Sequence, residues 1–400
     1  MFKDKDKILF FAGSGHLGGA EVSLLDLIRH FVVSEHYEVT VVVPDSGVEL
    51  EQEIQKKFSE KVHVHYFEYP SSLKRLGRFS RLPTYLLTAR DFIEYTNQVM
   101  AFIEKNSIDV FYANGIKPFL VGCRLKAQRS KTQKPLKLIW HLRDWLVGKK
   151  QFGLGILAKL YADRVVSNSM ATAGQLLWGD ASRQRPRIIL NSIDTEKYKP
   201  IEKEVARGRL GLPSQKLIVG MVGMLAPWKG QEVFIRASHY FRGQEVLFCI
   251  AGDEIYSTDG HGMEKKRLEE LSKNLQMKSQ VKFLGHVNDV ESVYNACDLI
   301  VHASVEPEPF GRCIAESMSC GIPVIATRAG GAVELNTKQG IPFYVPPGDE
   351  TALAKAIEQI LKNPNRMELG LKGREWILSH LDFNLKKDEF NSVIEEVLAA

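Results

Sequence analysis

The amino-acid sequence predicts an α/β protein made of two Rossmann-like domains, each a parallel sheet wound with helices. Short apolar segments with the length of buried strands alternate with predicted helices along the whole chain, and this order is typical of parallel sheets. The chain of 400 residues is longer than one hydrophobic core usually supports. A charged segment near residues 198–211 separates two such alternating series, so each series predicts one domain.

The first series predicts an N-terminal domain over residues 1–197. A glycine-rich turn follows its first apolar strand and leads into a helix over about residues 21–33. Pro44 stops the second strand, because proline cannot donate a backbone hydrogen bond to a sheet. The predicted strands of this domain comprise residues 8–11, 39–43, 109–113, 138–140, 164–168 and 187–190.

The second series predicts a C-terminal domain over residues 198–381. Residues 312–320 are predicted to form a helix, because Gly321 and Pro323 follow them as a helix-ending signal. A last helix is predicted over residues 382–398. The predicted strands comprise residues 217–222, 246–251, 281–284, 299–302, 323–326 and 343–345.

The composition is that of an ordinary soluble globular protein, with 44% hydrophobic and 25% charged residues and a net charge of +5. The five cysteines form no C-x-x-C pair, and most lie in apolar segments, which predicts buried, reduced thiols in a cytoplasmic protein. No signal peptide and no apolar segment of membrane-spanning length is expected.

Two glutamates, Glu308 and Glu316, stand eight positions apart around the point where a predicted strand turns into a predicted helix. The backbone amides of Phe310, Gly311 and Arg312 at that turn would form an anion site backed by the helix dipole. A carboxylate repels phosphate but accepts hydrogen bonds strongly from neighbouring hydroxyl groups. The pair of glutamates therefore fits a nucleotide-sugar better than a bare nucleotide.

This segment resembles the E-x7-E motif of the retaining glycosyltransferases with the GT-B fold, the large family often called GT4. Further matches to family motifs occur in the family's order at residues 18–21, 191–194, 220–230, 250–253, 281–285 and 330–334. The resemblance implies two Rossmann-like domains that face each other across a cleft, with residues 382–400 crossing back onto the first domain. It also implies that Glu308 contacts the hydroxyls of the donor sugar and Glu316 those of the ribose.

Lys229 is the best candidate for a cation that stabilises the charge developing on the leaving diphosphate. It follows Pro227 and Trp228 on a loop after a predicted strand and precedes Gly230, which would steer its side chain. The family usually places an arginine earlier in this loop, where the present chain has Met224. A complete clamp of two cations is therefore in question.

The resemblance implies further contacts to the donor. His141, directly after a predicted strand of the first domain, would lie close to the anomeric carbon. A separate hypothesis, which the resemblance does not supply, is that the nearby Asp144 orients its ring. Gly18 and Gly19 would let the backbone approach the diphosphate, and Val287 would offer backbone polar groups to the base. Glu334 is a weaker candidate that would equally cap a helix. No metal and no other cofactor is expected, because the sequence has no D-x-D motif at a strand end and no H-E-x-x-H motif.

An NAD-dependent oxidoreductase is the main alternative. Residues 13–18 form a G-x-G-x-x-G sequence between a strand and a helix, and Asp45 follows the second strand as a ribose-binding acid would. The paired glutamates of the second half favour the glycosyltransferase. A sugar-nucleotide epimerase with the same fold, or a lectin-like protein without turnover, also stays open.

The acceptor side is predicted from two basic, amphipathic stretches. Residues 71–90 contain five basic residues and no acidic one, and residues 145–157 combine lysines with large apolar side chains. Such stretches lie on anionic membranes, although solvated helix faces would explain them equally well. Together these features predict a retaining, metal-independent hexosyltransferase at the inner leaflet of the membrane. Its donor would be a UDP-sugar and its acceptor a lipid-linked compound or a saccharide in surface polysaccharide or glycolipid synthesis, and no nucleic-acid partner is expected.

Overall fold

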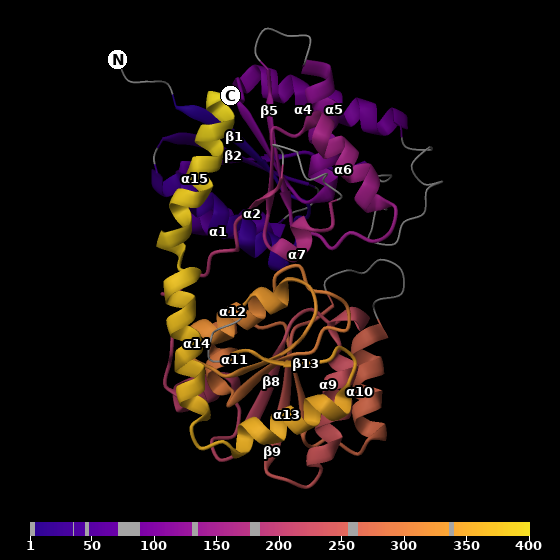
Figure 1. Cartoon of the computed structure of the whole chain (residues 1–400), viewed down its shortest axis with the longest axis vertical. Helices are drawn as coiled ribbons and strands as arrows, with labels where there is room; N and C mark the ends of the chain where they lie inside the picture. Colours follow the sequence, from indigo (N-terminus) through magenta and orange to yellow (C-terminus); the bar gives the residue numbers. More distant parts are fainter. Residues whose placement is uncertain are drawn as a thin grey trace. The chain divides into compact units, whose positions relative to one another are not determined.

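The chain folds into two compact units in a computed structural model that describes residues 5–34, 36–44, 48–70, 89–129, 135–176, 185–254, 263–335 and 340–400. One unit comprises Met1–Ser192 and Lys386–Ala400, and the other comprises Ile193–Leu385 (Figure 1). The division falls a few residues before the predicted boundary at residue 197. The last helix, α15 (Phe383–Ala399), begins in the second unit, and most of it belongs to the first.

The first unit is built on a sheet in which all strand pairs are parallel. Among the described residues the sheet has seven strands in the order β3-β2-β1-β4-β5-β6-β7. Side chains of successive residues in β1 point to opposite faces, and both faces are buried, as expected for a parallel sheet covered by helices. The strands are β1 Asp6–Phe11, β2 Tyr37–Val43, β3 Val62–Tyr66, β4 Val110–Asn114, β5 Lys137–Leu142, β6 Arg164–Ser167 and β7 Arg187–Ile188.

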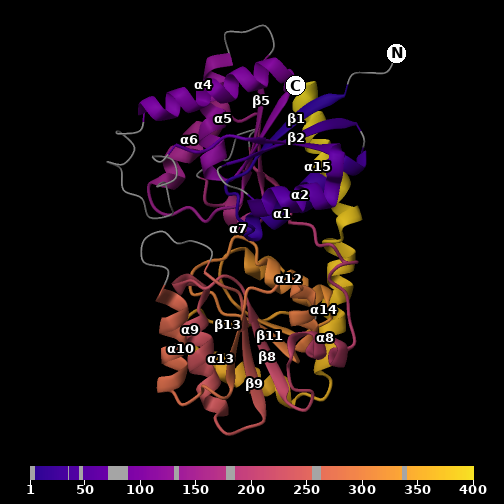
Figure 2. The same cartoon turned by 180° about the vertical axis from the view of Figure 1, so that it is seen from behind.

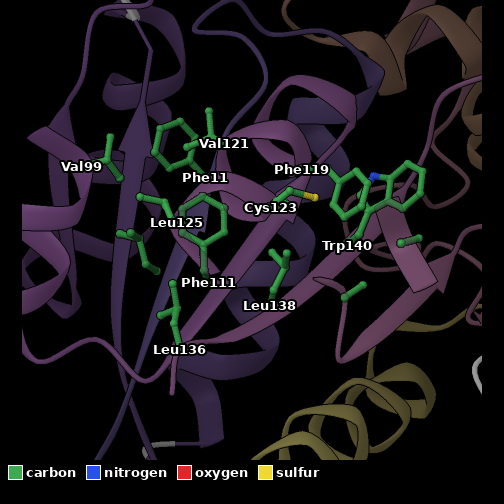
Figure 3. Packing of buried hydrophobic residues seen from close by; sticks show 14 of the residues in the cluster. Phe11, Val99, Phe111, Phe119, Val121, Cys123, Leu125, Leu136, Leu138 and Trp140 are labelled. Atoms are coloured by element: carbon green, nitrogen blue, oxygen red, sulfur yellow. The ribbon is translucent and has the colours of Figure 1, made fainter. Parts of the chain in front are cut away.

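Helices cover both faces of this sheet (Figure 2). Apolar residues of α1, α2 and α15 pack with Ile8 and Phe10 on one face, and residues of α4, α5 and α6 pack with Leu9 and Phe11 on the other. Figure 3 shows the second cluster, where Phe119 of α5 stacks on Trp140 of β5 at 4.0 Å between ring centroids. The helices are α1 Gly19–Ser34, α2 Val48–Phe58, α4 Ala89–Asn106, α5 Ile116–Arg129, α6 Lys150–Tyr161 and α7 Met170–Ala173, with a 3-10 turn η1 at Ser59–Lys61.

The second unit repeats this architecture with its own parallel sheet. Within the described residues the strand order is β10-β9-β8-β11-β12-β13. The strands are β8 Leu217–Val222, β9 Val246–Ala251, β10 Val281–Gly285, β11 Leu299–His302, β12 Val324–Thr327 and β13 Phe343–Val345.

Two helical layers enclose the second sheet. Residues of α9, α10 and α13 form a core with one face, while α11, α12 and α14 lie on the other face (Figure 1). The helices are α8 Lys203–Leu210, α9 Gln231–Ser238, α10 Glu264–Asn274, α11 Val290–Ala296, α12 Arg312–Ser319, α13 Glu350–Lys362 and α14 Arg366–His380. Short 3-10 turns are η3 Pro227–Lys229, η4 His239–Phe241 and η6 Gly331–Glu334.

The predicted fold class is therefore confirmed. Every predicted strand is present, with each end within a few residues of its predicted position, and β3 is an additional strand that the sequence did not predict. All five cysteines are free thiols and four of them are buried, while Cys313 is partly exposed.

Candidate active site

The candidate active site lies where the strand order of the second sheet reverses. From β8 the chain continues to β9 and β10 on one side, whereas from β11 it continues to β12 and β13 on the other. The loops that leave the carboxyl ends of two such neighbouring strands diverge, and ligands of open α/β sheets bind in the crevice between them. Lys229 lies on the loop after β8 and Glu308 on the loop after β11. Two of the predicted site residues therefore meet at this switch point.

The carboxylate of Glu308 is the centre of a compact polar cluster. Lys229 Nζ donates a hydrogen bond to Glu308 Oε2 at 2.7 Å, and Ser304 Oγ donates to the same oxygen at 3.3 Å. His302 Nε2 lies 3.5 Å from this oxygen. Burial opposes ionisation of the carboxyl group, but the charge of Lys229 and the contact with His302 outweigh it and hold the pKa of Glu308 below its ordinary value. Glu308 is therefore a fixed negative charge beside a fixed positive one.

Close backbone packing holds the loop that carries Lys229 against the loop that carries Glu308. Gly230 adopts a positive φ of 78°, and any Cβ at this position would overlap the carbonyl group of Ala303. The amide of Val305 donates to the carbonyl of Trp228 at 2.9 Å. The two loops are thus joined before any ligand binds.

A second close approach fixes the backbone of Glu308 itself. Gly330 has a φ of 65°, and a Cβ there would overlap the backbone of Glu308. The neighbouring amide of Gly331 donates to the Glu308 carbonyl oxygen at 2.7 Å. The Gly-Gly pair of the motif at 330–334 therefore holds the backbone of Glu308 in place, which explains why glycine is needed at position 330.

The turn from β11 into α12 has the geometry of an anion site. Gly311 is the N-cap of α12 with a φ of 94°, a conformation that glycine adopts without strain. The first amides of a helix have no intrahelical acceptor and carry the positive end of the helix dipole. The ring of Phe310 is buried with 2% exposure, so this residue offers only its backbone to a ligand.

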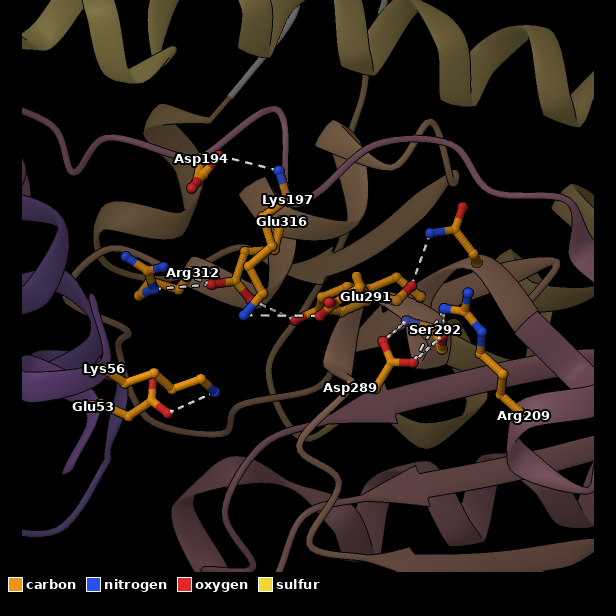
Figure 4. Close-up of polar contacts among 12 residues, drawn as sticks. Glu53, Lys56, Asp194, Lys197, Arg209, Asp289, Glu291, Ser292, Arg312 and Glu316 are labelled. Carbon is orange, nitrogen blue, oxygen red and sulfur yellow. Dashed lines mark hydrogen bonds and ion pairs between the residues drawn. The ribbon is translucent and has the colours of Figure 1, made fainter. Parts of the chain in front are cut away.

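Glu316 faces the interior of the second unit from the second turn of α12. Its Oε1 accepts a hydrogen bond from Arg312 Nε at 2.9 Å (Figure 4). Its Oε2 accepts one from the hydroxyl of Tyr294 at 2.7 Å. Burial raises the pKa of Tyr294 well above its ordinary value, so this phenol stays a donor. Each carboxylate oxygen accepts more than one hydrogen bond, and a ribose hydroxyl would have to share Glu316 with these partners.

Two family models match the chain. The model described as "Glycosyl transferases group 1" matches residues 202–376, and the model "Glycosyltransferase Family 4" matches residues 17–197. Together they account for most of both units. The chain belongs to the group 1 glycosyltransferase family. This assignment favours the predicted glycosyltransferase over the NAD-dependent oxidoreductase.

Solved structures with the GT-B fold match nearly the whole chain. The Anabaena protein HepE, solved with UDP, is 26% identical, has a TM-score of 0.79 and covers 98% of this chain and 100% of its own. Its structure with UDP-glucose has a TM-score of 0.81 at 25% identity and covers 98% of this chain and 99% of its own. Sucrose-phosphate synthase from Thermosynechococcus elongatus, at 19% identity and a TM-score of 0.80, covers 99% of this chain and 100% of its own and shares the fold.

The curated relatives match a shorter region. D-inositol 3-phosphate glycosyltransferase from Salinispora arenicola is 30% identical over 216 residues, which are 50% of this chain and 47% of the relative. The match thus spans about half the length of the curated relatives.

The glycine loop of the first unit follows β1 and precedes α1, as the family motif implies. The amide of Gly18 donates to Glu21 Oε2 at 3.3 Å and to the carbonyl of His16 at 3.0 Å, while Gly19 begins α1. Burial raises the pKa of Glu21 to about 7. The Gly18 amide therefore already has partners in its own loop and in the first turn of α1.

His141 differs from its predicted placement. It lies within β5 instead of after it, and its ring is fully buried. Nδ1 of the ring lies 2.9 Å from the hydroxyl of Tyr112 and 3.2 Å from Arg143, and burial together with the Arg143 charge lowers the pKa of His141 well below its ordinary value. Asp144 accepts a hydrogen bond from the amide of Ile116 at 3.2 Å, whereas Tyr112 and Arg143 orient the ring. Contact between His141 and a donor stays a prediction.

The remaining predicted residues lie at the same carboxyl edge of the second sheet or beside it. Val287 is half-buried on the loop between β10 and α11, and Glu334 ends η6. Met224 uses its carbonyl oxygen as the acceptor for Gln231 Nε2 at 2.7 Å. Among the described residues, no three or more His, Cys, Asp or Glu side chains form a metal-binding group.

The sequence missed three residues that contact the glutamates. His302 and Ser304 reach Glu308, and Tyr294 reaches Glu316. The signal for His302 was present, because it is the single ionisable residue in the strand segment that leads directly to Glu308.

Two features singled out in the sequence lie outside the described residues. They are Asp45 and nearly all of the basic stretch at residues 71–90. At the end of that stretch, Arg90 pairs with Glu94 at 2.9 Å on the surface of α4. In the part of the chain that the structure describes, no helix combines the length and the apolar character that crossing a bilayer requires.

Proposed function

We propose that this chain transfers a hexose from a UDP-sugar to a lipid-linked or saccharide acceptor, with retention of the anomeric configuration. The observation that carries the proposal is the pair of Lys229 and Glu308, 2.7 Å apart, at the switch point beside the N-terminus of α12. A nucleoside diphosphate needs positive potential and amide donors, and a sugar needs hydroxyl acceptors. The loops after β8 and β11 together offer both, with Lys229 on the first and the glutamates and amide donors on the second.

The diphosphate would bind at the first amides of α12 with Lys229 as its cation, because negative charge grows on the leaving group as the glycosidic bond breaks. Glu308 would accept hydrogen bonds from the sugar hydroxyls, and Glu316 from the ribose. The acceptor oxygen forms a bond to the anomeric carbon as the bond to the phosphate oxygen breaks, and the departing phosphate takes the acceptor proton. The dipole and Lys229 supply positive charge in the protein itself, so we propose that no resident metal ion is needed.

Two classes of acceptor are proposed, each supported by a different observation. The first candidate, a lipid-linked acceptor at the cytoplasmic face of a membrane, rests on basic, amphipathic sequence. The curated relatives named D-inositol 3-phosphate glycosyltransferases favour a phosphorylated cyclitol as a second candidate.

Product analysis tests the reaction directly. The purified chain is incubated with UDP-glucose and a panel of lipid-linked, saccharide and cyclitol phosphate acceptors, and the anomeric coupling constant of the product is read by NMR. An α-linked product from the α-linked donor, formed equally well after treatment with EDTA, is expected. A β-linked product would contradict retention, and loss of activity that Mg²⁺ restores would contradict the proposed independence from metal.

Glu308→Gln and Lys229→Met are the matched variants for the same assay. Both keep the size of the side chain and remove one charge of the pair. Lys229→Met should lower kcat more than it raises the KM for the donor, because its charge acts mainly on the transition state. Glu308→Gln should lower kcat and also weaken binding of the donor sugar, because the sugar hydroxyls lose a charged acceptor. Wild-type turnover in both variants would reject the site.

A further inference from the structure

Helix α6 exposes a line of large apolar side chains to solvent. Phe152, Ile156 and Leu160 are 63%, 42% and 67% exposed. They are spaced four residues apart, so they lie on one face of the helix. The opposite face, which includes Leu154 and Ala158, is buried in the core of the first unit. Such a row of exposed apolar side chains on one helix indicates a surface that binds something.

Positive charge surrounds this apolar line. Residues 145–162 contain Lys149, Lys150 and Lys159 and no acidic residue. Lys149 precedes Phe152 by three positions and Lys159 follows Ile156 by three, so both lie beside the line on the helix surface. Lys149 and Lys159 are exposed.

Helix α14 of the second unit provides an internal comparison. Its residues Met367, Leu371 and Leu378 are 37%, 50% and 41% exposed, which resembles α6. Two acidic residues, Glu368 and Glu375, stand among them. Exposed apolar side chains therefore occur on both helices, but only α6 of the two combines them with charge of one sign.

We infer that the exposed face of α6 docks on an anionic lipid surface. A helix with an apolar line flanked by lysines lies in the plane of a bilayer interface, with its apolar side chains among the acyl chains and its lysines at the headgroups. A second copy of the chain fits this face poorly, because two such faces would bring lysines of like charge together. The purpose of this docking rests on the proposed function, because a lipid-linked acceptor would be presented at such a surface.

Vesicle co-sedimentation tests the inference with the full chain. Vesicles of phosphatidylcholine with phosphatidylglycerol are compared with vesicles of phosphatidylcholine alone, and the wild type is expected to bind the anionic ones. The triple variant Phe152→Gln, Ile156→Gln, Leu160→Gln removes the apolar line but keeps helix-forming residues. It should weaken partitioning on the order of 100-fold, because three half-exposed apolar side chains lose their burial.

The matched control is the triple variant Met367→Gln, Leu371→Gln, Leu378→Gln on α14. It changes a similar exposed apolar area and should leave vesicle binding unchanged. Equal loss of binding in both triple variants would overturn the assignment to α6. Failure of the wild type to bind anionic vesicles would overturn it as well.

A charge variant separates the lysines from the apolar side chains. Lys149→Gln with Lys159→Gln should weaken binding to anionic vesicles about 25-fold, because each lysine near an anionic surface contributes about fivefold. Unchanged binding would overturn the role of charge. A different outcome would assign this face to a second copy of the chain. In that case the wild type would not bind vesicles, and the triple Gln variant of α6 would change the oligomeric state, so the inference would fail.

Calorimetry with UDP on the same samples keeps the two proposals distinguishable. Intact UDP affinity without vesicle binding would overturn only the lipid surface. Vesicle binding without UDP affinity would overturn the proposed function and leave the α6 surface in place.

Discussion

The ion pair between Lys229 and Glu308 should couple these two residues energetically even without a ligand. The atoms are 2.7 Å apart, and the side chains are only 23% and 18% exposed. Breaking a fully buried pair costs about 3–5 kcal/mol, and an exposed pair contributes less than about 1 kcal/mol. The intermediate exposure of this pair predicts a coupling energy of roughly 2 kcal/mol.

A double-mutant cycle measures this coupling. The free energy of unfolding is obtained from urea titrations of the wild type, Lys229→Met, Glu308→Gln and the double variant. Each single change leaves one charge without its partner, whereas the double change removes both, so the double variant should be less destabilised than the sum of the single ones. A coupling energy below about 0.5 kcal/mol would refute the pairing, because distant sites add within that limit.

The pH dependence of the same cycle supplies a second check. The folded-state pKa of Glu308 lies below its ordinary value of 4.5. Stability from this group is therefore fully present above that value and is lost as the pH falls below it towards the folded-state pKa. The coupling should shrink as the pH is lowered through 4.5, and a coupling that stays constant would contradict the assigned charge state.

Three further predictions concern the free energy of unfolding measured in urea. Tyr294→Phe should destabilise the chain by about 1.5–3 kcal/mol, because it removes a buried donor to the charged Glu316, and an unchanged midpoint would contradict that contact. Gly208→Ala in α8 should stabilise the folded chain by about 0.5–1 kcal/mol, because a Cβ at this position meets open space. Gly370→Ala in α14 should destabilise it, because a Cβ there would overlap a backbone carbonyl group. Equal effects of the two substitutions would refute this contrast. Glu21 has a folded-state pKa of about 7, raised by burial from 4.5, so wild-type stability should fall by roughly 3 kcal/mol as the pH rises through this range, and Glu21→Gln should abolish that fall.

Much of the fold could be predicted because buried parallel strands are short, apolar and regularly spaced in the sequence. The missed strand, β3, explains the limit of this signal. It is an edge strand in which His63 and His65 alternate with valines, so it lacks the continuous apolar run of a buried strand. At the opposite edge, β7 ends at Ile188 instead of the predicted residue 190, since an edge strand has only one partner to define its length.

The sequence likewise predicted one part of the candidate site and missed another. Glu308, Gly311 and Glu316 belong to one contiguous strand-turn-helix segment, so local sequence was enough to predict their arrangement. The contact between Tyr294 and Glu316 depends on how α11 packs beside α12, which no local pattern encodes.

The burial of His141 depends on still more distant sequence. Its ring lies 6.1 Å from that of Phe390 on α15, far away along the chain. A histidine at the end of an apolar segment looks the same in the sequence whether a distant helix covers it or not.

Binding of a nucleotide-sugar at the β8–β11 switch point is tested most directly by calorimetry. UDP-glucose, UDP and NAD are each titrated into the wild type and into Glu308→Gln, which retains the shape of the carboxylate without its charge. UDP and UDP-glucose should bind the wild type, NAD should give no heat of binding, and the variant should bind UDP-glucose about tenfold more weakly with little change for UDP. Binding of NAD without binding of UDP, or equal affinity of both proteins for UDP-glucose, would contradict a sugar-nucleotide site built around Glu308.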